Sequence, residues 1–310
     1  MPRFSVVISV FNKEDQIGDT INSVLAQTET DFEIVILNDG STDASETVIE
    51  GFTTDPRIRY YSEKNQGASA GRNFLIKKAK GEFIALLDGD DLWLPNYLDE
   101  IKRLISVFPN EAVYATNSEK FNGRRIISRN YSVDISKFEE IKVNLFEASY
   151  EDSIVNSSSV VLKKDVFEKI GYYNPNLKSG EDTDLFVRLG LNYPVVFSPK
   201  VCTQILILDN SLSHTSLNVE TKASFAEYEN LEGNNEPLKK FLDLNRYSLC
   251  LLAILDDNQM AFEKFRAKID LQNLNKKQRF LLKQNKTTLR RLLKTKKSLA
   301  KLGLKLSAFK

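Results

Sequence analysis

The chain is poor in the residues that mark disulfide frameworks and metal clusters. Its 310 residues include only two cysteines, Cys202 and Cys250, which lie far apart and outside any metal-ligand spacing. This pattern excludes a disulfide scaffold and favours a reducing compartment. The single histidine, His214, lies in a polar loop, where a solvated side chain is more common than a ligand. The single tryptophan, Trp93, is expected to pack in the core.

Long apolar runs are also missing. No run approaches the roughly 18 residues that span a bilayer. The first apolar stretch, from Val6 to Phe11, is too short for a signal peptide and leads directly into charged residues. We therefore expect a chain that is neither exported nor membrane-spanning and that resides in the cytoplasm.

The charge is balanced overall but unevenly distributed. The formal net charge is +1, yet the segment from Lys268 to Lys310 has 14 lysines and arginines against one acidic residue, Asp270. This segment therefore carries about +13 and the rest of the chain about −12. The positive charge is confined to one end, and no nucleic-acid-binding module is recognisable, so we expect no nucleic-acid partner.

The basic segment also contains an apolar stripe at helical spacing. The stripe consists of Leu282, Leu289, Leu292, Leu299, Leu302, Leu306 and Phe309. A basic amphipathic helix of this kind can lie on an anionic membrane surface, which predicts peripheral membrane binding through residues 276–310. The stripe could equally pack on the protein itself or on a second copy, as in a homodimer.

The first hundred residues alternate short β-branched runs with helical stretches, as parallel α/β units do. Runs such as Ser5–Ile8 are apolar on nearly every residue, which is typical of strands covered on both faces. The expected strands are 4–10, 32–37, 58–61 and 82–87, and the expected helices are 13–27, 43–52 and 70–80. The prediction is an α/β fold with a Rossmann-like, mixed but mostly parallel sheet flanked by helices.

The rest of the chain is less regular up to about residue 215 and helical beyond about 220. The expected helices are 95–108, 164–170 and 183–191, and the expected strands are 112–117 and 153–162. We expect two halves of one domain, residues 1–115 and 116–218, followed by a helical C-terminal region, 219–310, with residues 229–237 as a plausible boundary loop.

Three carboxylates follow the strand predicted for residues 82–87. Asp88, Asp90 and Asp91 form an Asp-Gly-Asp-Asp tetrad with Gly89. Magnesium and manganese prefer oxygen ligands and accept substrate phosphates into their shell, so a strand-end carboxylate pair can suffice when a diphosphate completes the site. The alternative is a turn, where Asp and Gly cluster for local reasons.

Two further segments have both a functional and a structural interpretation. Asp39, in the turn after the second strand, could accept a hydrogen bond from a base N–H, or it could belong to a turn that caps the next helix. The segment Asn65–Asn73, with Gly67 and Arg72, could bring backbone and a guanidinium to a phosphate, or it could be a glycine-permitted loop.

Acidic residues also open the helix predicted near residue 183. Glu181 and Asp182 are favoured there by the helix dipole alone, but a carboxylate in reach of an acceptor hydroxyl could also act as a general base. Asp184 is expected on the surface of this helix.

These segments occur together in one order, beginning with Ser5–Asn12 and including Asn65–Gly67 and Ala70–Asn73. In that order the chain resembles family 2 glycosyltransferases, which have the A-type glycosyltransferase (nucleotide-diphospho-sugar transferase) fold. The resemblance covers roughly residues 3 to 215. It implies a nucleotide-sugar-binding half followed by an acceptor-binding half.

The resemblance also implies roles for individual residues. Asp182 would be the catalytic base with Glu181 beside it, and Asp90 would be the main metal ligand together with Asp88. The residues implied on the donor side are Phe11, Asp39, Gly67, Arg72 and Asp88. Of these, Asp39 would contact the nucleotide base. The metal would be manganese or magnesium.

The implied activity is inverting transfer of a hexosyl or N-acetylhexosaminyl group, with a UDP-sugar the preferred donor. The acceptor would be a hydroxyl of a glycan or lipid-linked saccharide in surface polysaccharide assembly, at the cytosolic face of the membrane. Many relatives carry a metal-binding histidine where this chain has Leu208. His214 is therefore a further candidate ligand, and we expect the metal to bind only together with the donor.

Three alternatives remain. The first is a catalytically degenerate member that serves as a nucleotide-sugar-binding scaffold, which Leu208 motivates. The second is a sugar nucleotidyltransferase, which lacks support because no lysine-bearing glycine-rich signature follows the first strand. The third is the nucleic-acid binder already considered.

Overall fold

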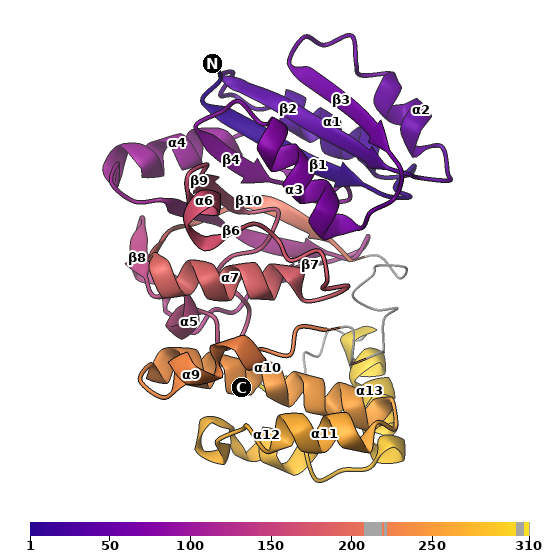
Figure 1. The fold of residues 1–310 in the computed structure, drawn as a ribbon, viewed down its shortest axis with the longest axis vertical. Coiled ribbons are helices and arrows are strands. Elements are labelled where there is room, and N and C mark those ends of the chain that lie inside the picture. Colours follow the sequence, from indigo (N-terminus) through magenta and orange to yellow (C-terminus); the bar gives the residue numbers. More distant parts are fainter. Residues whose placement is uncertain (208–218, 220–221, 302–306, 310) are drawn as a thin grey trace.

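The computed structural model describes residues 1–207, 219, 222–301 and 307–309. Its strands form one sheet (Figure 1). They are β1 (Phe4–Val10), β2 (Phe32–Asp39), β3 (Ile58–Glu63), β4 (Phe83–Leu86), β5 (Leu92–Trp93), β6 (Val113–Phe121), β7 (Ile126–Ser128), β8 (Ile141–Val143), β9 (Val160–Lys163) and β10 (Val195–Leu206).

The main path of the sheet is β3-β2-β1-β4-β9-β6-β10-β5, while β7 pairs with β6 and β8 with β10. The strands β3, β2, β1, β4, β6 and β10 run in one direction, and β9 lies antiparallel between β4 and β6. The short strands β5, β7 and β8 are also antiparallel to their neighbours. The expected mixed, mostly parallel sheet is confirmed.

Helices cover both faces of the sheet and continue beyond it. The α-helices are α1 (Ile17–Leu25), α2 (Ser45–Glu50), α3 (Ala68–Lys78), α4 (Tyr97–Val107), α5 (Leu145–Ala148), α6 (Val166–Ile170), α7 (Glu181–Asn192), α9 (Glu229–Glu232), α10 (Glu236–Leu255), α11 (Gln259–Arg266), α12 (Lys276–Leu281) and α13 (Lys286–Lys301). The 3₁₀ helices are η1 (Ile135–Lys137), η3 (Ala226–Tyr228) and η4 (Leu271–Asn273).

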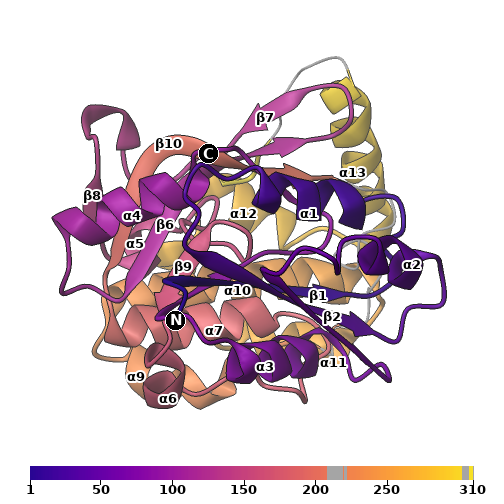
Figure 2. The same ribbon diagram turned by 90° about the horizontal axis from the view of Figure 1, so that it is seen from above.

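Two buried clusters explain why the early strands are apolar on consecutive residues. Val6 and Ile8 of β1 pack with α1, α2 and α4, whereas Val7 packs in the cluster that contains side chains of α3, α6 and α7. Figure 2 shows α1 and α3 on opposite sides of β1. Successive side chains of a strand point to opposite faces, so a sheet covered on both sides needs apolar residues at both parities.

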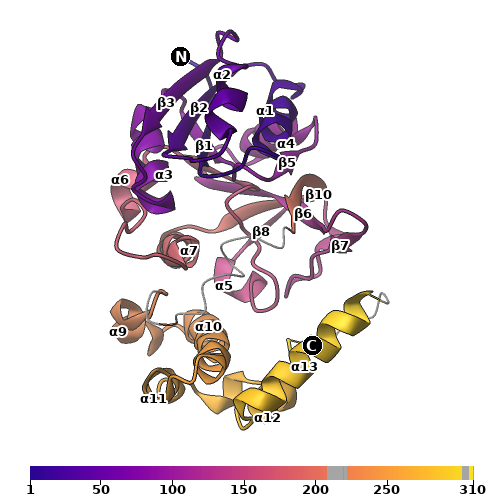
Figure 3. The same ribbon diagram turned by 90° about the vertical axis from the view of Figure 1, so that its right-hand side faces the viewer.

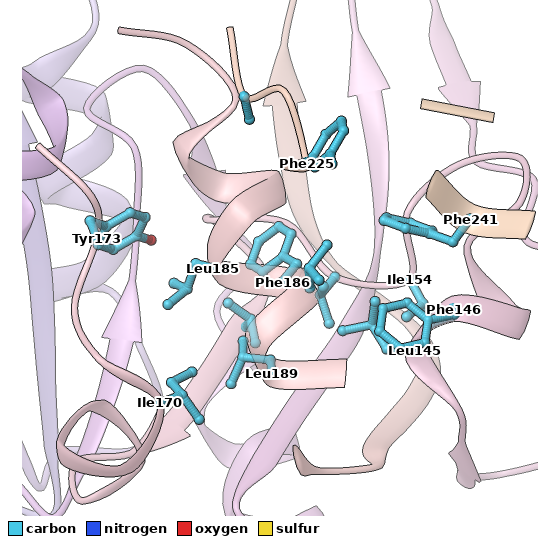
Figure 4. Close-up of a cluster of buried hydrophobic side chains, with 14 of the residues drawn as sticks. Leu145, Phe146, Ile154, Ile170, Tyr173, Leu185, Phe186, Leu189, Phe225 and Phe241 are labelled. Carbon is cyan, nitrogen blue, oxygen red and sulfur yellow. The ribbon is translucent and has the colours of Figure 1, made fainter. Parts of the chain in front are cut away.

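The C-terminal helices form a further layer below the sheet (Figures 1 and 3). Helix α10 packs on α5 and carries α11 and α13. The rings of Phe146 in α5 and Phe241 in α10 are 5.4 Å apart, and one buried cluster extends from α7 to α10 (Figure 4). The C-terminal helices therefore share a core with the sheet. Within the ranges described above, no helix has both the length and the apolarity to cross a membrane.

The structure corrects three predictions about local structure. The boundary loop expected at residues 229–237 instead contains α9 and the start of α10. The strand expected from residue 153 begins only at Val160, because Ser157, Ser158 and Ser159 form a turn. The helix expected from residue 13 begins only at Ile17. The backbone amides of Asn12 and Lys13 instead donate to Ser41 and Ser45, which ties this segment to the loop after β2.

Candidate active site

The candidate site lies at one edge of the sheet, where the parallel strands β1, β2 and β4 end. Phe11 follows β1 and is 41% exposed, Asp39 ends β2, and Asp88 follows β4. The first turns of α3 and α7 bring Arg72 and Asp182 to the same edge. Carboxyl ends of parallel strands are where ligands bind in open α/β sheets. The sequence-predicted residues on these five segments are therefore gathered in one region.

Asp39 is buried and held by backbone amides. Its two carboxylate oxygens accept hydrogen bonds from the N–H groups of Gln66 at 2.9 Å and Gly67 at 3.0 Å. Gly67 has a φ of +87°, in the region that favours glycine, and it directly precedes α3. Asp39 thus fixes the loop that leads into α3. It does not cap α2, the next helix, whose N-cap residue is Ala44 and has no side-chain cap.

Each of the three carboxylates in the acidic tetrad has a different side-chain partner. Asp88 is 36% exposed at its side chain and accepts a hydrogen bond from Arg72. Asp90 pairs with Lys13. Asp91 is buried and accepts from Ser158 Oγ at 2.5 Å and from the Leu206 amide at 2.9 Å. Asp91 therefore ties the tetrad to β10, and only Asp88 and Asp90 remain open to a ligand.

Asp91 is surrounded by protein and by the other carboxylates of the tetrad. Burial and the neighbouring charges of Asp88 and Asp90 raise the pKa of Asp91 well above its usual range. Desolvation disfavours the charged form of a buried carboxyl, which is why burial is the largest cause of this rise.

Arg72 connects the tetrad with the start of α7. Its Nη2 donates to Asp88 Oδ1 at 2.7 Å, and its Nη1 lies 3.2 Å from Glu181 Oε1 and 3.5 Å from Asp182 Oδ1. Burial alone would lower the pKa of Arg72, but Asp182 and Asp88 raise it well above its usual range. One buried cation thus holds three carboxylates, two of which the sequence assigned to catalysis.

Asp182 is the carboxylate with a basicity suited to proton transfer. Ser157 Oγ donates to Asp182 Oδ1 at 2.7 Å, and 34% of the Asp182 side chain is exposed. Desolvation by the surrounding protein raises the pKa of Asp182 to about 6, against the lowering effect of Arg72. A general base works best when its pKa is near the operating pH.

Tyr173 supports Arg72 from the side of the core. The Arg72 guanidinium lies 5.3 Å from the centroid of the Tyr173 ring, which is buried. The amide of Asn73 holds the Tyr173 backbone by two hydrogen bonds, of 2.8 and 2.9 Å. Figure 4 shows Tyr173 on the loop before α7, with its hydroxyl turned toward that helix. Arg72 and Asn73 are therefore both held in place by contacts with Tyr173.

Asp184 differs from the prediction that placed it on the helix surface. Its side chain is buried, with Arg188 Nη2 2.6 Å from Oδ2 and the Tyr228 hydroxyl donating to Oδ1 at 2.6 Å. The prediction was wrong because η3 covers this part of α7. Asp184 joins the C-terminal region to the helix that carries Asp182.

A cavity of about 360 Å³ opens beside Asp88 and Asp182 and extends to the C-terminal helices. Both polar and apolar side chains line it. The polar lining includes Asn156, Ser157, Asp182 and Arg129, and the apolar lining includes Phe186, Phe241, Leu244 and Phe309. Helix α10 therefore forms part of the wall of the candidate site.

The carboxylates of Asp88 and Asp90 fit a hard divalent cation, because both offer oxygen ligands and both are partly exposed. Among the residues that the structure describes, no three side chains of His, Cys, Asp or Glu gather as a metal site. Leu208 and His214, which the sequence linked to the metal, lie outside the described residues. Any cation here would need oxygen ligands from water or a bound phosphate.

Sequence reasoning missed several residues that organise the site. The hydroxyl of Ser158 donates to Asp91 and accepts from the Asp88 amide at 3.2 Å. The backbone carbonyl of Ser158 accepts from Trp93 Nε1 at 2.7 Å. The signal was the run of three serines inside an otherwise apolar segment, which is unusual for a buried strand. As predicted, Trp93 is buried, and it stacks on Tyr97.

Sequence and structure comparisons relate the chain to known proteins. Residues 5–171 match the family model described as Glycosyl transferase family 2. An uncharacterized glycosyltransferase of Rickettsia typhi is 26% identical over 217 residues, 70% of this chain and 68% of that protein. A Bacillus subtilis protein named for teichuronic acid biosynthesis, TuaG, is 25% identical over 228 residues, 72% of this chain and 86% of that protein. A further relative in Rickettsia felis, 28% identical over 64% of this chain, is longer, and the match spans 33% of it.

Two solved structures resemble the chain over most of its length. S. aureus TarS 1-349, in complex with UDP-GlcNAc, has a TM-score of 0.59 and 20% identity, with 87% of this chain and 89% of that chain covered. The mannosyltransferase PcManGT from Pyrobaculum calidifontis, in complex with GDP-Man and Mn²⁺, has a TM-score of 0.59 and 16% identity, with 96% and 80% covered. At these identities the likeness shows a shared fold.

Proposed function

Because the chain belongs to glycosyl transferase family 2 and has the A-type glycosyltransferase fold, we propose that it transfers a sugar from a nucleoside diphosphate to a hydroxyl acceptor with inversion. The proposal rests on one arrangement: Arg72 bridges Asp88 at the strand edge and Asp182 at the start of α7. Our preferred donor is a UDP-sugar that carries a hexosyl or N-acetylhexosaminyl group.

In this proposal Asp182 removes the proton of the acceptor hydroxyl as its oxygen attacks the anomeric carbon. With a pKa of about 6, Asp182 is ionised at neutral pH and is a stronger base than an ordinary aspartate. Glu181 takes part through Arg72, to which it is bonded at 3.2 Å. Ser157 fixes the orientation of the Asp182 carboxylate.

Negative charge develops on the diphosphate as the sugar leaves. Asp88 and Asp90 would hold Mn²⁺ or Mg²⁺, which when bound neutralises that charge. Arg72 lies beside Asp88 and supplies a buried guanidinium to the same region. Lys13, paired with Asp90, adds a second cation. The mannosyltransferase with bound Mn²⁺ supports a divalent cation in this fold.

The donor base and ribose would lie near the ends of β1 and β2. A carboxylate oxygen has lone pairs for more than one hydrogen bond, so Asp39 can accept from a base N–H while it holds the amides of Gln66 and Gly67. Phe11 is exposed next to this site and could cover the base. We assign donor binding to residues 1–115 and acceptor binding to 116–218, with 219–310 covering the acceptor side.

The acceptor is proposed to be a glycan or lipid-linked saccharide of surface polysaccharide assembly, which the name of TuaG supports. Peripheral binding at the cytosolic face of an anionic membrane would suit such an acceptor. Leu282 and Leu289 of the predicted stripe pack into the core, but Leu292 and Leu293 are 41% and 42% exposed. The exposed part of α13 also carries Arg290, Arg291, Lys294 and Lys296.

A screen of nucleotide sugars for protection against thermal unfolding, with Mn²⁺ present, tests donor binding. A ligand that binds only the folded state raises the unfolding temperature. We expect UDP-sugars to give the largest rise, and Asp39→Asn to reduce it. If no nucleotide sugar raises the unfolding temperature, donor binding is refuted, and protection without turnover would instead favour the scaffold alternative.

A further inference from the structure

The cavity beside Asp182 contains one cation that no step of the proposed chemistry uses. Arg129 follows β7 and lines the cavity together with Asn156, Ser157 and the apolar residues of α10. Among the described residues that line this cavity, it is the only Lys, Arg or His side chain. The cavity therefore has one cationic side chain among four acidic ones, which are Asp88, Asp91, Glu151 and Asp182.

The hydrogen-bonding capacity of Arg129 is largely unused. Its Nη2 donates to the Ser153 carbonyl at 3.1 Å, while its buried Nε has no hydrogen-bond partner. Within the part of the chain that the structure describes, Arg129 forms no ion pair. A buried donor without a partner costs free energy, so such a group is a candidate for binding a ligand.

The neighbouring carboxylate, Asp152, is already engaged by other groups. It accepts from the Asn130 amide at 2.8 Å and pairs with Lys120 at 3.3 Å. The carboxylates across the cavity, Asp88 and Asp182, are both bridged by Arg72. Arg129 also lowers the pKa of Asp152 by Coulombic attraction, without forming an ion pair with it. The guanidinium N–H groups of Arg129 that do not bind Ser153 are therefore what an incoming anion would contact.

We propose that Arg129 is an acceptor-side anion subsite, which binds a carboxylate or phosphate group carried by the acceptor saccharide. The planar guanidinium matches both oxyanions in geometry. The apolar wall of Phe241, Leu244 and Phe309 lies in the same cavity and suits a sugar ring or an attached apolar group. The subsite rests on the proposed transferase function and specifies the charge of its acceptor.

Saturation-transfer NMR at constant ionic strength tests the subsite with four small probes. Glucuronic acid and glycerol 3-phosphate carry the anion, and glucose and glycerol are their neutral counterparts. We expect the wild type to bind one or both anionic probes more tightly than the neutral ones, and Arg129→Gln to weaken that binding by about tenfold or more. Binding of glucuronic acid alone indicates an acidic sugar, and binding of glycerol 3-phosphate alone indicates a phosphate-bearing acceptor.

Arg125→Gln is the matched control, because Arg125 is an exposed arginine next to the same strand β7. It should bind the probes as the wild type does. Arg129→Lys keeps the charge without the planar fork, so it should retain part of the binding and shows that a loss in Arg129→Gln is not unfolding. Equal binding of charged and neutral probes, or anion binding that survives Arg129→Gln, would overturn the subsite. UDP binding by the wild type, measured in parallel, tests the transferase function separately.

Discussion

The guanidinium of Arg72 lies 3.5 Å from the carboxylate of Asp182. The two residues are far apart in the sequence: Glu181, which directly precedes Asp182, is 109 positions after Arg72. The same guanidinium donates to Asp88. Arg72 therefore connects Asp88, the position expected for the donor diphosphate, with Asp182, the expected catalytic base. Because Asp88 and Arg72 both act on the pKa of Asp182, a charged ligand that binds at Asp88 should also shift the pKa of Asp182.

The pH dependence of turnover should follow Asp182. Its pKa is about 6, so kcat/KM should fall as the pH drops below about 6 and the base becomes protonated. Ser157→Ala removes a hydrogen bond that stabilises the ionised carboxylate. The pKa of Asp182 should then rise, and the acidic limb of the pH profile should move to higher pH. An unchanged limb in Ser157→Ala, with Ser106→Ala as the exposed control, would contradict this role.

Metal binding should depend on the nucleotide. Asp88 and Asp90 provide too few ligands to hold Mn²⁺ tightly, so titration calorimetry should show weak binding to the free protein and tighter binding with UDP present. Asp90→Asn should abolish the enhancement by UDP, whereas Asp19→Asn, on the exposed side of α1, should not. Strong Mn²⁺ binding without nucleotide would show that the site has further ligands.

The bond between Tyr228 and Asp184 should stabilise the contact between α7 and the C-terminal region. Tyr228→Phe removes a buried donor to a carboxylate, which should lower the free energy of unfolding by about 2 kcal/mol. Tyr172→Phe, which removes an exposed hydrogen bond to Glu168, should have little effect. Chemical denaturation of both variants measures the free energy of unfolding. Equal losses in the two variants would mean that the bond from Tyr228 to Asp184 does not stabilise the fold.

The exposed leucines of α13 should determine membrane binding. Leu292→Asn with Leu293→Asn should reduce flotation with vesicles that contain anionic lipid, because both side chains are solvent-exposed among arginines and lysines. Leu231→Asn changes an equally exposed leucine outside α13 and should leave flotation unchanged. Flotation that is the same in all variants would rule out this surface, and a change in molecular mass by light scattering would point to a second copy instead.

The sequence predicted the elements whose signal is local. Strand β1 has the predicted bounds, Phe4–Val10, because it is apolar on nearly every residue and is soon followed by a charged segment. The positions of Asp39 and Asp88 at strand ends and of Arg72 in a helix were also predicted, since strand ends and helix starts are themselves marked in the sequence. Their placement at one edge follows from the parallel order of the strands.

Tertiary contacts explain what the sequence could not predict. Ser157 and Ser158 act through partners far away in the chain, and Tyr173 matters because Asn73 and Arg72 pack on it. The burial of Asp184 depends on Tyr228, which the helical pattern of α7 does not reveal. The cavity wall from α10 likewise arises only when the C-terminal helices dock on α5 and α7.

The most direct test of the account is release of the nucleoside diphosphate from a panel of nucleotide sugars, in the presence of Mn²⁺ and candidate acceptors, by the wild type and Asp182→Asn. The account predicts turnover by the wild type and a loss of about 10²- to 10⁴-fold in kcat for Asp182→Asn, the range expected for a general base, while protection by the same donor against unfolding persists. Wild-type turnover that survives Asp182→Asn would contradict the assignment of Asp182 as the base.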